Sequence, residues 1–181
     1  MLHRIVKLAA SLPKLLREVP ILSKGSDGVV LLSQLQAASL LSCSFLCLYN
    51  SPRRGMGGMN MNALFEERNI EKLKCILHYF GRVADDNYTP RNLLRFHRRC
   101  MRVQPAFESC RDVLFSPGVT VTSHGKIEDV NTKDYIHADF ANKILGGGVL
   151  GHGLVQEGNR ACVDGHVLIS LFFRNQIPNL P

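Results

Sequence analysis

Apolar residues recur with the period of a helix in several stretches of the first half of the chain. In the first stretch they share one helical face: Leu2, Ile5, Val6, Ala9 and Leu12. We expect this helix to end near Pro13, because proline lacks the N–H that would continue the hydrogen-bond ladder.

A second helix is predicted from a capping signal. Residues 33–36, Ser-Gln-Leu-Gln, have the form of a capping box, with Ser33 as the N-cap and Gln36 reaching back to it. Further residues then follow at helical spacing: Leu35, Ala38, Leu41, Ser42 and Phe45. Residues 1–50 are therefore predicted to be helical, and the glycine-rich residues 51–62 are predicted to form a loop.

The clearest helical pattern covers residues 69–80. Its apolar stripe consists of Ile70, Leu73, Leu77 and Phe80. Gly81 follows at once and is expected to end the helix, since glycine commonly closes helices.

Strand-like patterns begin after residue 113. Residues 119–122, Val-Thr-Val-Thr, are β-branched and predict a strand. Residues 135–141 alternate, with Ile136, Ala138 and Phe140 on one side and Asp139 on the other. The pattern as a whole predicts a mixed α+β or α/β fold, with a helical N-terminal region followed by a sheet.

The composition favours a folded protein with a polyanionic partner. The chain has 181 residues, of which 45% are hydrophobic and 20% charged, so a buried core is expected. A net charge of +7 fits nucleic acid, an acidic membrane or another polyanion equally well. Residues 91–102 are strongly basic, which indicates a solvated face or, as the alternative, an anion-binding patch.

The six cysteines give little support to a zinc site, because no pair has the Cys-x-x-Cys spacing. Cys43 and Cys47 lie in an apolar stretch and are interpreted as buried thiols, which suits a reducing intracellular compartment. The basic, acid-free residues 1–17 fit either an organellar transit peptide or an ordinary surface helix. Residues 29–49 are uncharged, but polar side chains interrupt them, so they predict a packed helix and not a membrane span.

Residues 139–157 hold the most informative pattern. A strand would deliver Asp139 and Asn142 to its end, just before a glycine-rich segment that we call the glycine loop (residues 146–153). Glycine has no Cβ to keep a ligand away, and successive backbone N–H groups can form a concave site for a diphosphate. Gln156 and Glu157 follow, but no P-loop or Rossmann spacing is present. A flexible turn before a helix is the alternative.

The exact residues resemble a known family. Asp-Phe-Ala-Asn at 139–142, the triple glycine at 146–148 and Val-Gln-Glu at 155–157 are similar to the signature of poly(ADP-ribose) glycohydrolases. Residues 33–45, 64–66 and 72–80 resemble the helical accessory region of that family. The resemblance implies a macrodomain with a helical extension, and hydrolysis of ribose–ribose O-glycosidic bonds in poly(ADP-ribose) without a metal or cofactor.

The resemblance also implies roles for individual residues. Asp139 and Glu157 would be the catalytic residues, with Glu157 bonded to ribose hydroxyls. The remaining positions would bind substrate: Ile127 and Glu128 at the adenine, Gly146, Gly147 and Gly148 at the diphosphate, and Asn142 and Gln156 elsewhere on the ligand. The implied partners are ADP-ribose, poly(ADP-ribose) and poly(ADP-ribosyl)ated proteins. The implied location is the nucleus, the cytoplasm or both, with mitochondrial targeting by the basic N-terminus as an alternative.

One position departs from the signature. The family has a second Glu directly after the first, whereas this chain has Gly158, which cannot transfer a proton in glycoside hydrolysis. We therefore divide the chain into a helical accessory region (1–112), the start of a macrodomain-like catalytic region (113–158) and a divergent tail (159–181). The expectation is a family member truncated within its signature and of doubtful activity. The alternatives are a non-catalytic ADP-ribose-binding module and a basic helical interaction protein with no ligand.

The tail contains a nearly continuous apolar run at residues 167–173, which could form one buried strand or short helix. If this run finds no sheet to join, it is an exposed, β-prone segment that favours aggregation. We therefore expect residues 69–80 to be the well-ordered part and the residues beyond 159 to be poorly protected.

Overall fold

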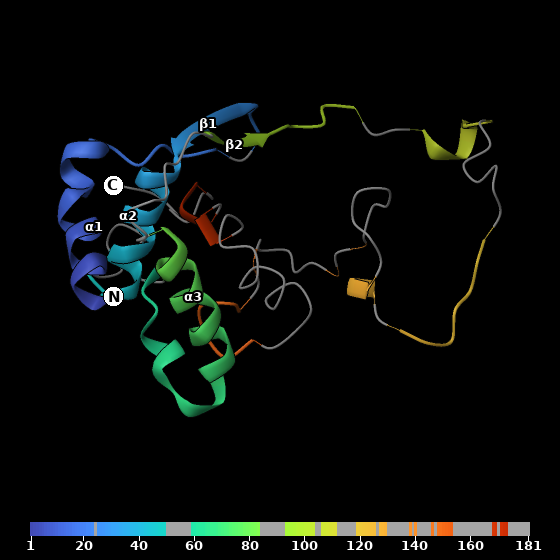
Figure 1. The fold of residues 1–181 in the computed structure, drawn as a ribbon. Helices are drawn as coiled ribbons and strands as arrows, with labels where there is room; N and C mark the ends of the chain where they lie inside the picture. The colour runs from blue at the N-terminus through green and yellow to red at the C-terminus, as the bar shows by residue number, and fades with distance from the viewer. Residues whose placement is uncertain are drawn as a thin grey trace. The chain divides into compact units, whose positions relative to one another are not determined.

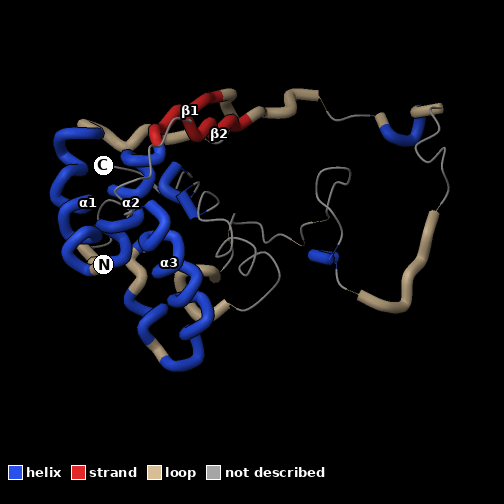
Figure 2. The backbone as a smooth tube through the Cα atoms, viewed as in Figure 1, coloured by secondary structure: helices blue, strands red, loops and turns tan. Residues whose placement is uncertain are grey.

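The computed structural model describes residues 1–23, 25–49, 59–83, 93–103, 106–111, 119–125, 127–129, 138, 140, 146, 148–153, 168–169 and 171–173 (Figure 1). The chain divides into two compact units. The larger unit comprises Met1–Cys100 and Phe140–Pro181, and the smaller comprises Met101–Asp139. Within the described residues, helices and one small antiparallel sheet occur together, which confirms the predicted mixed class (Figure 2).

Helix α1 (Leu2–Leu15) packs against α2 (Gln34–Phe45) in the larger unit (Figure 1). The helix ends at Leu15, two residues beyond Pro13, so the predicted end near Pro13 is right to within one turn, with Pro13 itself inside the last turn. Proline leaves the carbonyl four residues earlier without its usual N–H donor. That carbonyl belongs to Ala9, and the Cys43 thiol lies 3.9 Å from it as a donor, so α2 compensates for the break in the α1 ladder.

The capping box at the start of α2 is confirmed. The Gln36 N–H donates to the Ser33 hydroxyl at 3.2 Å, and the Ser33 N–H donates to the Gln36 side chain at 2.8 Å. Every residue from 37 to 45 is buried, so α2 is the central helix of the unit. No helix among the described residues is long and apolar enough to cross a membrane.

Two expectations for this region need correction. Leu35, placed on the apolar face by its spacing, is 39% exposed. Cys43 is buried as expected, but Cys47 is exposed. The reason is that α2 ends at Phe45 and the chain then turns, with Cys47 in the left-handed region at φ 55°.

Strands β1 (Gly28–Ser33) and β2 (Leu93–Arg98) pair antiparallel, with Val30 opposite Phe96. Neither strand was predicted, since residues 1–50 were taken as helical and residues 91–102 as a solvated charged face. The physical reason is alternation: Val30 and Leu32 are buried while their neighbours Val29 and Leu31 are exposed. β2 alternates in the same way, so its charges lie on a strand with one half-buried face.

Helix α3 spans Ile70–Val83 and follows two short 3₁₀ turns, η3 (Asn62–Phe65) and η4 (Glu67–Asn69). The helix itself was predicted, but Gly81 does not end it. The buried stripe also differs from the expected one, because Ile70 is 50% exposed. The buried residues are Asn69, Lys72, Ile76 and Phe80, spaced three or four apart and therefore on one face.

The apolar run near the C-terminus joins the core of the larger unit. Leu168, Ile169, Leu171 and Phe173 are all at most 3% exposed. The Phe173 carbonyl accepts a hydrogen bond from the Leu22 N–H at 2.9 Å, and the Phe173 ring lies 4.9 Å from that of Phe96. For these residues the alternative of a buried segment holds and that of an exposed, aggregation-prone segment does not, because they pack in the core that includes the inner face of the β1–β2 sheet.

The smaller unit contains the short turns η5 (Phe107–Ser109) and η6 (Ile127–Asp129). The strand predicted over residues 119–122 is not formed, and those residues are exposed. Alternating β-branched residues form a strand only beside another strand, and the described residues place none next to this segment. The strand predicted over residues 135–141 lies outside the described residues, except for Ala138 and Phe140.

Candidate functional site

The glycine loop forms a compact turn within the larger unit. The Val149 N–H donates to the Gly146 carbonyl at 3.0 Å, and the Gly151 and Gly153 N–H groups both donate to the Gly148 carbonyl, at 2.9 and 3.1 Å. Gly146 adopts a φ of +78°, a backbone angle that residues other than glycine rarely adopt.

Two further glycines are required by close approach. A Cβ on Gly153 would lie 2.8 Å from the Gly148 Cα, and a Cβ on Gly148 would lie 3.0 Å from the Gly153 nitrogen. A Cβ on Gly151 would meet nothing closer than 3.7 Å. The turn therefore depends on glycine at 148 and 153 and tolerates a side chain at 151.

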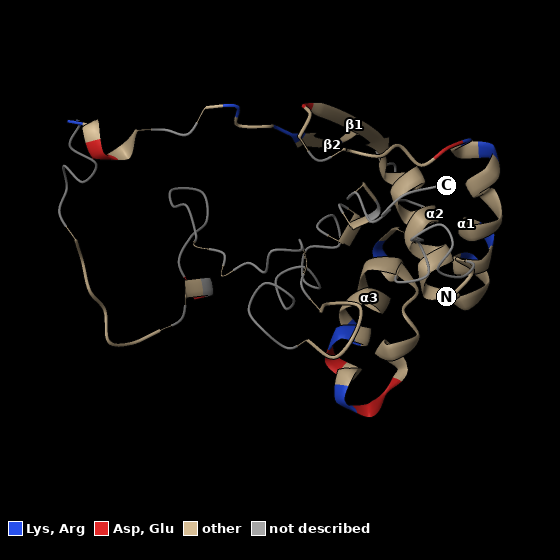
Figure 3. Cartoon of the chain, turned by 180° about the vertical axis from the view of Figure 1, so that it is seen from behind, with Lys and Arg blue, Asp and Glu red and all other residues tan. Residues whose placement is uncertain are grey.

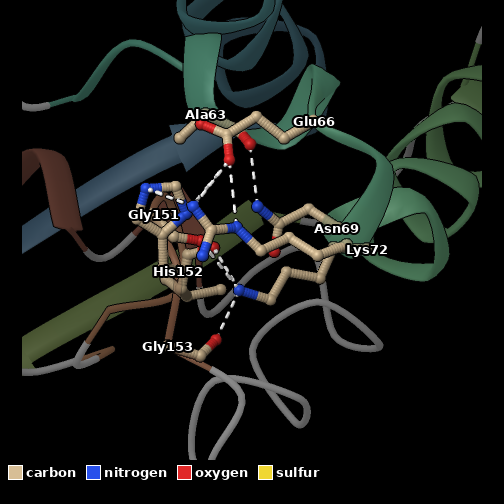
Figure 4. A network of polar contacts seen from close by, with 9 residues as sticks. Ala63, Glu66, Asn69, Lys72, Gly151, His152 and Gly153 are labelled. Carbon is tan, nitrogen blue, oxygen red and sulfur yellow. Dashed lines mark hydrogen bonds and ion pairs between the residues drawn. The ribbon is translucent and has the colours of Figure 1, made fainter.

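The loop is held from one side by Lys72 of α3, which is 4% exposed. Its ammonium donates to the carbonyls of Val149 at 3.3 Å and Gly151 at 3.0 Å, and also to the carbonyl of Gly153 (Figure 4). A buried charge is tolerated only when it is well hydrogen-bonded. Since an ammonium has three N–H donors, one carbonyl for each satisfies it.

The backbone N–H groups of Leu150 and His152, in the same loop, differ from the carbonyls that Lys72 binds. No acceptor for the Leu150 N–H or the His152 N–H occurs among the residues that the structure describes. The residue His152 is exposed and Leu150 is partly exposed. Within the described part of the chain, these two N–H groups are therefore candidates for contact with a ligand.

A charged cluster flanks the loop. Arg68 donates twice to one Glu66 carboxylate oxygen, at 2.8 and 3.0 Å, and the His152 ring lies 3.6 Å from that oxygen and 3.3 Å from Arg68 (Figure 4). Figure 3 shows that acidic and basic residues gather together around η4 and the start of α3. Because these side chains are about half exposed, each pair contributes on the order of 0–1 kcal/mol.

Asn69, the last residue of η4, is buried beside Lys72 of α3 (Figure 4). Its amide donates to the Ala63 carbonyl at 2.8 Å, which ties η4 to η3. Its Oδ1 atom is buried and has no hydrogen-bond partner among the described residues.

Few of the residues predicted for the site fall within the described part of the chain. Gly146 and Gly148 lie together in the loop. Ile127 lies half-buried in η6 of the smaller unit, and the backbone of Glu128 belongs to the same turn. The others lie outside the described residues: Asp139, Asn142, Gly147, Gln156, Glu157 and the departing Gly158. The predicted cleft of Asp139, Asn142 and Glu157 therefore stays a prediction.

Sequence reasoning missed Lys72. One signal could have found it, because Lys72 stands four residues before Ile76 and eight before Phe80, and so shares the buried face of α3. A lysine on an apolar helix face needs a partner, although the sequence does not say which. In the described part of the chain, no group of three or more His, Cys, Asp or Glu residues could hold a metal.

Comparison with known proteins assigns the family. The model of the poly(ADP-ribose) glycohydrolase helical domain matches residues 1–98, which is more than half of the chain. The chain belongs to the poly(ADP-ribose) glycohydrolase family. A second model of this family, described as having the macro domain fold, matches residues 105–179.

Curated members of the family are similar over most of the chain. Poly(ADP-ribose) glycohydrolase 1 of Arabidopsis thaliana is 34% identical over 164 residues, which are 84% of this chain and 29% of that protein. A probable poly(ADP-ribose) glycohydrolase 2 of the same plant is 29% identical, over 81% of this chain and 31% of its own length. Poly(ADP-ribose) glycohydrolase 2 of Caenorhabditis elegans is 27% identical, over 99% of this chain and 36% of its own. The chain thus spans about a third of the length of these relatives.

Proposed function

We propose that this chain binds the ADP-ribose units of poly(ADP-ribose), with the diphosphate received by the backbone of the glycine loop. The observation that carries the proposal is the closed turn in which the Leu150 and His152 N–H groups lack acceptors among the described residues. Successive backbone N–H groups in such a turn form a concave anion site. Glycine at 148 and 153 permits the close backbone approach that shapes it.

The rest of the ligand would be bound by the residues that the family resemblance implies. Ile127 and Glu128 would contact the adenine, and Asn142 and Gln156 would bind other parts of the substrate. The partners we propose are poly(ADP-ribose) and proteins that carry it, in the nucleus or the cytoplasm.

For the residues that match the family signature, the reaction that we propose is glycosidic hydrolysis, with Asp139 and Glu157 at the scissile ribose–ribose bond. Gly158 stands where the family signature has the carboxylate that protonates the leaving oxygen and then activates water. Loss of a positioned general acid typically removes about 10²–10⁴-fold of the rate. Binding is therefore the principal function that we propose, with turnover slow.

A matched pair of glycine variants tests the binding site. We expect Gly153→Ala to weaken ADP-ribose binding at least about tenfold, because its Cβ would press on the Gly148 backbone at 2.8 Å and deform the turn. Gly151→Ala is the control, since its Cβ would be in ordinary contact. Titration calorimetry with ADP-ribose measures both, and equal affinity of the two variants would contradict the assignment of the loop.

Thermal unfolding separates the remaining alternatives. A ligand that binds only the folded state raises its melting temperature. No shift of the wild-type protein with ADP-ribose or poly(ADP-ribose) would favour the basic interaction protein without a ligand. A Gly158→Glu variant then tests catalysis, because we expect it to release more ADP-ribose from the polymer than the wild-type chain does.

A further inference from the structure

We propose that Lys72 is a positioning residue, which orients two peptide groups of the glycine loop so that their N–H groups face a bound diphosphate. The inference rests on the proposed function of the loop and goes beyond it by placing a determinant of binding on a helix of the accessory region. Lys72 does not itself contact the ligand in this proposal.

The first step is the position of the ammonium. Lys72 extends from the buried face of α3 and donates to the carbonyls of Val149, Gly151 and Gly153, which are two residues apart in the loop. The carbonyls of these alternate residues therefore converge on one positive charge (Figure 4).

The second step follows from peptide geometry. The described backbone has no cis peptide bonds, and in a planar trans peptide the N–H points opposite to the C=O. The Val149 carbonyl shares its peptide group with the Leu150 N–H, and the Gly151 carbonyl shares its peptide group with the His152 N–H. When Lys72 binds these two carbonyls, the Leu150 and His152 N–H groups must point away from it. Both N–H groups lack an acceptor among the described residues, as does the N–H of Gly148.

The third step is electrostatic. A cation on the carbonyl side of a peptide group draws electron density toward the oxygen and strengthens the N–H on the other side as a donor. The buried ammonium also contributes positive potential that water screens only weakly. Both effects favour an anion on the far side of the loop.

The lysine at this position is tied to the loop. A neutral side chain of similar length would be easier to bury than an ammonium, but it would leave the three loop carbonyls without this donor. Arginine would keep the charge, but its planar fork does not match carbonyls that converge on one point. The arrangement requires a compact cation with three donors.

The test compares three variants of the full chain. Lys72→Met keeps the length of the side chain but removes the donors. Lys72→Arg keeps the charge and changes the geometry. Lys74→Met is the control, since Lys74 lies two residues away on the exposed side of α3 and is bonded to Glu71 at 2.7 Å. ADP-ribose and adenosine, which lacks the diphosphate, are the probes.

We expect Lys72→Met to lose at least about tenfold in affinity for ADP-ribose, which corresponds to the loss of one or two hydrogen bonds to a charged group. Its affinity for adenosine should be unchanged. Lys72→Arg should show the same selective loss to a smaller extent, and Lys74→Met should bind both ligands like the wild type. A loss of affinity for both probes would indicate a general structural role and would overturn the proposal.

Hydrogen exchange gives a measurement without ligand, so that failure of the proposed function can be recognised. In Lys72→Met the amides of Val149, Gly151 and Gly153 should exchange faster than in the wild type, while those of residues 76–80 stay slow. Unchanged loop exchange would overturn the proposal, even in a protein that binds ADP-ribose. If the wild type does not bind ADP-ribose while loop exchange still responds to Lys72, the proposed function fails and the positioning of the loop stands. If Lys72→Met does not fold, Lys72→Arg decides, because wild-type affinity and exchange in that variant would rule out a need for three converging donors.

Discussion

Helix α2 and the glycine loop both lie in the larger unit, but they are stabilised in different ways. Every residue of α2 from 37 to 45 is buried, and its core contacts come from several apolar side chains: Ala37, Leu40, Leu41 and Phe45. The described loop residues place one fully buried side chain in the core, Val149, and three of their carbonyls depend on a single ammonium. The stability of α2 comes from many contacts, whereas the conformation of the loop depends largely on the hydrogen bonds of Lys72.

The difference suggests a division of roles. A helix stabilised by many small contacts loses a fraction of its stability with any one substitution. A loop positioned by one side chain can lose its geometry while the fold survives. Substitutions in the helical part should therefore change the stability of the fold by graded amounts. The conformation of the loop should change little in the variants that stay folded.

The largest effect is expected at Phe80, which is fully buried and packs its ring 5.5 Å from that of Phe45. Phe80→Ala should lower the free energy of unfolding by about 3–5 kcal/mol, because it leaves a cavity in the core. Urea denaturation measures the change. Phe65→Ala is the matched control, since Phe65 also contacts the Phe45 ring but is 54% exposed, and an equal loss in both variants would contradict the proposed core.

A smaller effect is expected at the α2 capping box. Ser33→Ala removes the hydroxyl that accepts from the Gln36 N–H and should lower the free energy of unfolding by about 1 kcal/mol. ADP-ribose affinity should not change, because the loop keeps its Lys72 contacts. Ser26→Ala is the control, since the Ser26 hydroxyl makes an exposed bond outside any helix, and a stability loss as large as that of Ser33→Ala would argue against the cap.

A gain is expected at Gly81, where a Cβ would meet nothing within 4 Å. Gly81→Ala should raise the free energy of unfolding by about 0.5–1 kcal/mol, because alanine loses less conformational entropy than glycine when it enters a helix. A shift of the urea midpoint toward higher concentration is the measurement. Destabilisation would show that α3 does not continue past Phe80 in solution.

The smallest effect concerns chemical reactivity. Burial raises the pKa of the Cys43 thiol, so that less of the reactive thiolate is present at a given pH. Cys47 is exposed and should be alkylated faster by iodoacetamide, as followed by mass spectrometry of the two cysteines. The difference in labelling rate should disappear when the protein unfolds, and faster labelling of Cys43 in the native protein would contradict the packing of α2 on α1.

Local signals predicted the local structure. The capping box of Ser33 and Gln36 was recognised because its two partners lie three residues apart, and α3 was recognised from its own periodicity. Strand β2 was missed for two reasons. Its arginine and histidine residues were interpreted as a solvated charged face, and its partner β1 lies more than fifty residues earlier in the sequence. A pairing of this kind depends on a distant segment and not on either strand alone.

The candidate site was also predictable from the sequence only where the signal is local. The glycines at 146 and 148 could be predicted as site residues, because the proposed contact uses the backbone and a cluster of glycines in the sequence indicates an accessible backbone. The partners of Lys72 could not, since they are carbonyl groups about eighty residues away, and a carbonyl is present in every residue. Asp139, Asn142, Gln156 and Glu157 stay predictions from the family signature.

The bond between the Leu22 N–H and the Phe173 carbonyl has a consequence for the order in which the protein is made. The inner face of the β1–β2 sheet is complete only when residues 168–173 have left the ribosome. At a synthesis rate of about 5–20 residues per second, roughly four to fifteen seconds separate the end of β2 at Arg98 from Phe173. During that interval the part of the sheet face that residues 168–173 cover stays open, and a chaperone that binds exposed β-rich segments would have its best opportunity there.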